Sequence, residues 1–147
     1  MTWETCVRTL DERLGYLVVR AGLRVRKRYV AELAGLEMLP HHHAILSRLR
    51  QHGPTYQAEL AAQAGLAPAE AVGYFDSLRH VGYVVRDRDP VDRRKWIVIL
   101  TQAGADALAE ADQVLDALEA GIFACLTEAE KGVLATLVVR LAQTLPA

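Results

Sequence analysis

The sequence changes its hydrophobic period at Gly82, and this change constrains the fold more than any other feature. Upstream of Gly82, apolar residues recur every three or four positions, as they do on one face of an α-helix. Downstream, the β-prone runs YVV and WIVIL flank RDRDPVDRRK, the densest cluster of charge in the chain, at residues 86–95. Two such runs joined by a polar turn predict a β-hairpin. The chain is therefore predicted to be mainly α-helical, with one small β-hairpin.

Proline and glycine residues divide the helical part of the sequence into segments. Pro40 suits the first turn of a helix, whereas Gly53 followed by Pro54 ends one, because proline cannot continue a helix. Thr101 is expected to cap the helix that follows it, and the last helix is expected to begin with a capping box from Thr127 to Glu130. The predicted helices cover residues 10–36, 40–53, 56–64, 68–82, 102–123 and 127 onward.

The order of these elements indicates one domain made of two kinds of segment. Residues 40–101 contain a helix, a short helix-turn-helix and the hairpin, which is the order of a winged helix, a DNA-binding module. The flanking residues, 1–39 and 102–147, carry apolar stripes that have no partner within one winged helix. We therefore expect dimerisation helices that pack against a second copy of the chain. The stripes comprise Leu10, Leu14, Leu17, Leu134, Leu137 and Leu141.

Length and composition restrict the class of protein. The 147 residues are 52% hydrophobic and 24% charged, as in an ordered globular domain, and no apolar run reaches the roughly 18 residues of a membrane span. The N-terminal stretch MTWETCVRTLDERL lacks the apolar core of a signal peptide, so we expect a cytoplasmic protein with no membrane partner. Cys6 and Cys125 lie far apart in the sequence and are expected to be buried free thiols.

The net charge of −1 is unevenly distributed along the chain. Residues 101–147 contain seven acidic and two basic residues, so the remainder of the chain is mildly basic. An anionic partner can therefore approach the part of the protein that precedes residue 101.

The charged segment and the run that follows it carry a family resemblance. DRRKWIVILT resembles the D-x-R-x-x-x-V-x-L-T signature of the MarR family of bacterial transcription regulators, and the TQAG that follows is also typical of it. The matching residues are Asp92, Arg94, Val98, Leu100 and Thr101. The resemblance covers nearly the whole chain in element order and is sharpest over residues 59–104. It implies a homodimer whose two winged helices bind a pseudo-palindromic site on double-stranded DNA.

The resemblance implies that the hairpin is the wing. Arg94 would enter the minor groove, where the negative potential attracts arginine, and Asp92 would hold the turn and orient Arg88 or Arg94. Contacts to phosphates, which position a protein without reading sequence, are expected from Arg86, Arg93 and Lys95. A hairpin turn that is merely solvated is the alternative interpretation of the same charges.

The fourth helix is expected to lie in the major groove. With Phe75 and Leu78 as buried anchors, its groove-facing residues are Ala69, Glu70, Val72, Gly73 and Ser77, and Arg79 is a further predicted DNA contact. The five groove-facing residues include no basic side chain, although family members commonly carry Ser, Thr and Arg there. Glu70 can accept a hydrogen bond from a cytosine amino group, but it also repels phosphate. Loss of sequence-specific reading is therefore an alternative, which would leave a winged-helix interaction or ligand-binding module.

Three consecutive histidines, His41 to His43, open the second predicted helix. Neighbouring helical residues point about 100° apart, so the three rings cannot converge on one ion, and we predict no metal and no cofactor. The resemblance implies a pocket for small aromatic acids between the dimerisation helices and the winged lobe. Its candidate residues are His41, His42, Tyr16 and Arg20. Surface or helix-capping histidines are the alternative.

The sequence contains no nucleophile with a base at family spacing, no phosphate-cradling glycine loop and no catalytic metal cluster. We therefore predict no catalytic residues and no enzyme activity. The expected function is that of a ligand-responsive transcription regulator, a repressor that a small aromatic or phenolic acid releases from DNA.

Overall fold

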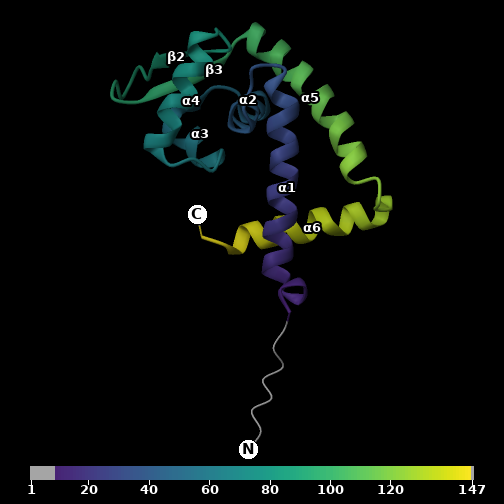
Figure 1. Ribbon diagram of the computed structural model, residues 1–147. Helices are drawn as coiled ribbons and strands as arrows, with labels where there is room; N and C mark the ends of the chain where they lie inside the picture. The colour runs from purple at the N-terminus through teal and green to yellow at the C-terminus, as the bar shows by residue number, and fades with distance from the viewer. Residues whose placement is uncertain (1–8, 147) are drawn as a thin grey trace, which may run out of the picture.

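The computed structural model describes residues 9–146 of the chain, and the predicted mainly helical class is confirmed (Figure 1). In chain order, the elements are the short 3₁₀-helix η1 (Leu10–Glu12), α1 (Leu14–Ala34), α2 (Pro40–His52), β1 (Thr55–Tyr56), α3 (Gln57–Gln63), α4 (Pro68–His80), β2 (Val84–Arg88), β3 (Trp96–Leu100), α5 (Gln102–Ile122) and α6 (Glu128–Thr144). The first predicted helix is interrupted, because Arg13 adopts an extended conformation between η1 and α1.

The sheet has three strands, and this corrects the predicted two-stranded hairpin. Strand order is β1–β3–β2 with antiparallel pairing, and Arg88 lies opposite Trp96 next to the turn of the hairpin. The additional strand β1 has only two residues, Thr55 and Tyr56, which pair with Val98 and Ile97. Tyr56 was assigned to the third predicted helix, because a two-residue strand shows no alternation in the sequence.

The hairpin and α5 meet in a close contact around Thr101. The Thr101 hydroxyl donates to the Gly82 carbonyl over 2.6 Å and accepts from the Gly104 N–H over 3.1 Å, which caps α5 as predicted. A Cβ atom on Gly104 would lie 2.1 Å from the Tyr83 carbonyl oxygen, so glycine is needed at this position. The winged lobe is thereby fixed to the first turn of a long helix that leads away from it (Figure 1).

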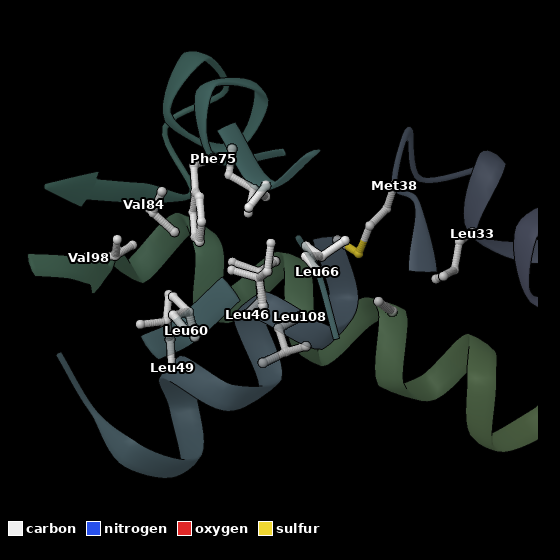
Figure 2. Packing of buried hydrophobic residues seen from close by; sticks show 14 of the residues in the cluster. Leu33, Met38, Leu46, Leu49, Leu60, Leu66, Phe75, Val84, Val98 and Leu108 are labelled. Atoms are coloured by element: carbon white, nitrogen blue, oxygen red, sulfur yellow. The ribbon is translucent and has the colours of Figure 1, made fainter. Parts of the chain in front are cut away.

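The core is centred on the winged lobe, between α2, α3, α4 and the sheet, and it extends onto α5. Figure 2 shows Leu46, Leu60, Phe75, Val84 and Leu108 converging there, and each is at most 1% exposed. Full burial of one such side chain contributes about 1.5 to 3 kcal/mol. Leu33 of α1 is also completely buried in this cluster. The lobe is therefore a tightly packed base for the residues on its surface.

The apolar stripes of the outer helices remain uncovered within one chain. None of the residues of α6 is buried, and this helix lies away from the winged lobe (Figure 1). Leu14 is 74% exposed and Leu137 is 50% exposed. Cys125, in the turn between α5 and α6, is also exposed, so the expectation that it is a buried thiol is wrong for the single chain. Cys6 lies outside the described residues.

Within residues 9–146, no helix has both the length and the apolar character that a membrane crossing requires.

Candidate nucleic-acid interface

A buried aspartate closes the turn of the wing, which consists of β2, β3 and the residues between them. The Oδ1 atom of Asp89 accepts from the backbone N–H groups of Val91 and Asp92 over 2.7 and 2.8 Å. Its Oδ2 atom accepts a short hydrogen bond from the Tyr56 hydroxyl. The bond from Tyr56, followed by those from Asp92 and Val91, lowers the pKa of the Asp89 carboxyl. Tyr56 thus connects the tip of the wing to the start of α3.

Sequence reasoning missed this connection and assigned the turn to Asp92. An aspartate that precedes proline and accepts from the N–H two residues on is a common turn former, so the Asp89–Pro90 pair offered a local signal. Tyr56 offered none, because 33 residues separate it from Asp89.

Asp92 orients Arg94, one of the two arginines proposed for it. Its Oδ1 atom accepts from both the backbone N–H and the Nε of Arg94 over 3.1 Å, and its Oδ2 accepts from Nη2 over 3.4 Å. These bonds lower the pKa of the Asp92 carboxyl. The side chain of Arg94 is nevertheless 91% exposed. The guanidinium is therefore held in one direction and remains accessible to a ligand.

Arg86 and Arg88 make contacts within the protein instead. Their guanidinium carbons lie 4.2 and 3.8 Å from the centroid of the Trp96 ring, within the range of cation–π attraction. Arg88 also donates to the Arg93 carbonyl over 2.6 Å. The Nε atom of Arg86 is buried and has no hydrogen-bond acceptor among the described residues. Arg86, for which a phosphate contact is expected, is therefore a half-buried side chain that packs against Trp96.

Arg93 and Lys95 are exposed on the wing, where the sequence places phosphate contacts. Between the wing tip and α4 the surface is hollowed by a cavity of about 490 Å³, whose lining includes Arg94, Lys95, Val72 and Phe75. The wing and the fourth helix therefore form two sides of one continuous, partly apolar surface.

The anchors predicted for α4 are confirmed, because Phe75 is 1% exposed and Leu78 is 2% exposed. The groove-facing residues Ala69, Glu70, Val72, Gly73 and Ser77 are all exposed. Arg79 is exposed too, and its guanidinium pairs with Asp76 over 3.4 Å. The surface of α4 is accordingly apolar and acidic, with one paired arginine towards its C-terminal end.

The histidines separate into different roles. The Nδ1 atom of His42 accepts from the Leu39 N–H over 3.1 Å, so His42 is a helix-capping histidine, the alternative left open above. Burial, and secondarily His41, lower the pKa of His42, which favours the neutral ring that this cap requires. The rings of His41 and His42 also pack edge-on against Tyr74 of α4. Residues 9–146 include no group of three or more side chains suited to a metal ion.

Tyr16 and Arg20 do not join His41 and His42 within one chain. Arg20 precedes Leu33 by 13 residues on α1, which corresponds to about 20 Å along the helix axis, and it pairs with Asp11 over 3.5 Å. The junction of the lobe with α1 and α5 instead contains a cavity of about 300 Å³ beside Tyr29 and His43. The predicted ligand residues therefore fall into two separate places.

The family model described as MarR family matches residues 40–96. The HTH-type transcriptional repressor NicR of Pseudomonas putida is 32% identical over 99 residues, which are 67% of this chain and 63% of NicR. The matched part thus spans less than two thirds of that relative.

Two solved structures of a further repressor are similar over almost the whole chain. The transcriptional repressor CouR bound to a 23-mer DNA duplex is 30% identical, with a TM-score of 0.86 over 90% of this chain and 94% of that one. CouR bound to p-coumaroyl-CoA is 26% identical, with a TM-score of 0.82 over 97% of this chain and 100% of that one.

Proposed function

The chain belongs to the MarR family of transcription regulators, and from this premise we propose that it is a repressor that binds a pseudo-palindromic DNA site as a homodimer. The observation that carries the proposal is the exposed Arg94 guanidinium, oriented by Asp92 at the tip of the wing. A guanidinium held in this way loses little freedom on binding and suits a narrow minor groove. The DNA complex of the similar repressor CouR supports the same partner.

The proposed contacts follow from the surface. Arg94 enters the minor groove, while Arg93 and Lys95, which are exposed beside it, contact phosphates. α4 lies in the major groove, where Val72 and Ala69 can meet thymine methyl groups and Glu70 a cytosine amino group. Arg88 and Arg86 support the wing through Trp96. Ser77, Gly73 and Arg79 complete the surface of α4 that faces the duplex.

The proposed homodimer rests on the exposed apolar stripes. Residues 1–39 and 102–147 would supply the dimerisation helices, and residues 40–101 the DNA-binding lobe. Leu134, Leu137 and Leu141 of α6 are 40%, 50% and 41% exposed, and so much apolar surface is costly in water. Analytical ultracentrifugation at micromolar concentration should therefore give a dimer. A folded monomer under these conditions would contradict the proposal.

We further propose that a small aromatic effector, an aromatic or phenolic acid or a derivative of one, releases the protein from DNA. NicR and CouR are both named repressors, and CouR binds p-coumaroyl-CoA. An effector acts only through different affinities for the DNA-competent and the released arrangement of the two lobes. A protein with this role acts where the bacterial DNA is, in the cytoplasm, and needs no enzyme activity.

A second candidate function is favoured by the surface of α4, which carries no basic residue at the five groove-facing positions. It is a winged-helix interaction or ligand-binding module that has lost sequence-specific reading. Selection of binding sites from a random pool of duplexes, followed by a salt titration, tests both candidates. Enrichment of an inverted repeat supports the repressor, whereas equal retention of all duplexes supports the second candidate.

A further inference from the structure

The tip of the wing presents apolar side chains beside its basic ones. The loop at the tip, residues 90–94, is closed by the Asp89 N–H, which donates to the Lys95 carbonyl over 3.0 Å. Val91 is 95% exposed, the highest value among the large hydrophobic side chains of residues 9–146. The exposed residues of the loop are Pro90, Val91, Arg93 and Arg94. Half of the exposed tip is therefore apolar, although the basic residues dominate its sequence.

The turn itself holds Val91 in this exposed position. The Val91 N–H donates to Asp89 Oδ1 over 2.7 Å, and the N–H of the next residue donates to the same oxygen over 2.8 Å. Asp89 is buried and also accepts from Tyr56, so the bonds of the turn are directed towards the protein. Pro90 has a fixed φ, and the branched side chain of valine is stiff at χ1. The isopropyl group is therefore presented to solvent in a defined position and loses little freedom on binding.

The same turn positions the arginine proposed for the minor groove. Asp92 donates its N–H to Asp89 and orients Arg94 with its own carboxylate. Val91 and Arg94 thus belong to one rigid loop, and a groove that admits Arg94 is also approached by Val91. Apolar side chains are a common means of contact in minor grooves. The floor of this groove differs between base pairs, because guanine alone carries a 2-amino group there.

Resting on the proposed repressor function, we infer that Val91 is a specificity-determining residue that disfavours G·C pairs beneath the wing tip. Its methyl groups pack in the minor groove above A·T pairs. At a G·C pair the 2-amino group projects into the space that the methyl groups fill, and valine offers this donor no acceptor. The contact involves no charge, so its contribution is independent of salt, unlike the phosphate contacts proposed for Arg93 and Lys95.

Fluorescence anisotropy of the full chain tests this role on variants of a selected DNA site. Each A·T pair of the site is replaced in turn by G·C or by inosine·C, which keeps the major-groove face of G·C but lacks the 2-amino group. At one or more positions, G·C should weaken binding about ten-fold and inosine·C should restore most of the affinity. Val91→Ala should weaken the A·T site about five-fold, reduce the preference over G·C to about two-fold and leave the salt slope unchanged.

The matched control is Val81→Ala. Val81 is 53% exposed and lies between α4 and β2, at the end of β2 opposite to the wing tip, so its loss should change neither affinity nor preference. The inference is overturned if the wild-type chain treats G·C and inosine·C alike at every position. It is also overturned if Val91→Ala keeps the wild-type preference, because the discrimination then belongs to Arg94, or if it weakens all duplexes equally, as a loosened turn would.

Failure of the proposed repressor function gives a different result. All the outcomes that overturn the role of Val91 leave binding of the selected site by the wild-type chain intact. If the wild-type chain binds none of the duplexes, the repressor proposal is contradicted, and the role of Val91 with it.

Discussion

The wing and α4 present opposite chemistry to the same proposed partner. The wing carries Arg93, Arg94 and Lys95 on its exposed side, with Arg94 oriented by a carboxylate. α4 carries alanine, valine, glycine and serine at its groove-facing positions, and its one charged residue there is acidic. Affinity for the DNA backbone and reading of bases are separable contributions to binding. If both surfaces contact DNA as proposed, the wing should supply most of the affinity, and the groove-facing residues of α4 should contribute shape, methyl contacts and the polar groups of Glu70 and Ser77.

The largest effect is expected from the wing. Arg94→Ala should lower affinity for a selected DNA site about 100-fold, because it removes both a positive charge and an oriented donor from a narrow groove. Fluorescence anisotropy with a labelled duplex measures the change, and no other single substitution within residues 86–95 should equal it. The matched control is Arg93→Ala, a proposed phosphate contact, which should weaken all duplexes similarly and reduce the salt slope by about one. If Arg94→Ala leaves the affinity unchanged, the wing does not contact DNA through Arg94, and the alternative interpretation as a solvated turn holds.

The next largest effect is expected from α4, and its sign separates two roles. If Glu70 accepts from a cytosine amino group, Glu70→Ala should remove the preference at one base pair, by about 1 to 2 kcal/mol. If Glu70 only repels phosphate, the same substitution should tighten binding to every duplex. Titration of matched and singly mismatched sites distinguishes these results, with Glu110→Gln, which removes an exposed acidic charge on α5 outside the proposed DNA-binding surface, as the control. No change on either site would mean that α4 does not approach the duplex as closely as proposed.

A smaller effect is expected from Tyr56, which connects the wing to the helix-turn-helix. Tyr56→Phe keeps the ring but removes the hydrogen bond to Asp89, so the wing tip should become less well positioned and affinity should fall about five-fold. Because the substitution acts through Arg94, it should lower the affinity for DNA much less in a protein that already carries Arg94→Ala. Tyr74→Phe, on α4, removes a hydroxyl away from the wing and serves as the control. Equal losses in both backgrounds would make Tyr56 a structural residue without a positioning role.

The sequence predicted the parts of the fold that local chemistry determines. Pro40, Gly53 and Thr101 mark helix ends through their own backbone and hydroxyl groups, and each marks one in the structure. β1 escaped prediction because its two residues are ordered by pairing with β3, some 40 positions later. Arg94 and Asp92 were recognised together because both match the D-x-R part of the family signature. The Tyr56–Asp89 bond and the cavity of Tyr29, His43 and Asp116 depend on tertiary packing, which leaves no pattern in the sequence.

The smallest expected effect is a difference between the wing and the α4 side of the lobe in how their stability depends on pH. Burial lowers the pKa of His42 below its usual value near 6.5, so the neutral ring contributes stability that is present above pH 6.5 and lost as the pH falls towards the lower value of the folded state. His42 caps α2 and packs against Tyr74 of α4, so mild acid should loosen this side of the lobe first. The carboxyls of Asp89 and Asp92 also have lowered pKa values, but their usual value is 3.8, so the wing should lose stability only below that pH.

Urea unfolding at pH 5, 6, 7 and 8 should therefore show stability that declines below about pH 6.5. In His42→Gln the amide can still accept from the Leu39 N–H, as in a capping box, but it cannot titrate, so this decline should flatten. A decline of equal steepness in His42→Gln would assign it to another group and remove the contrast between the two regions.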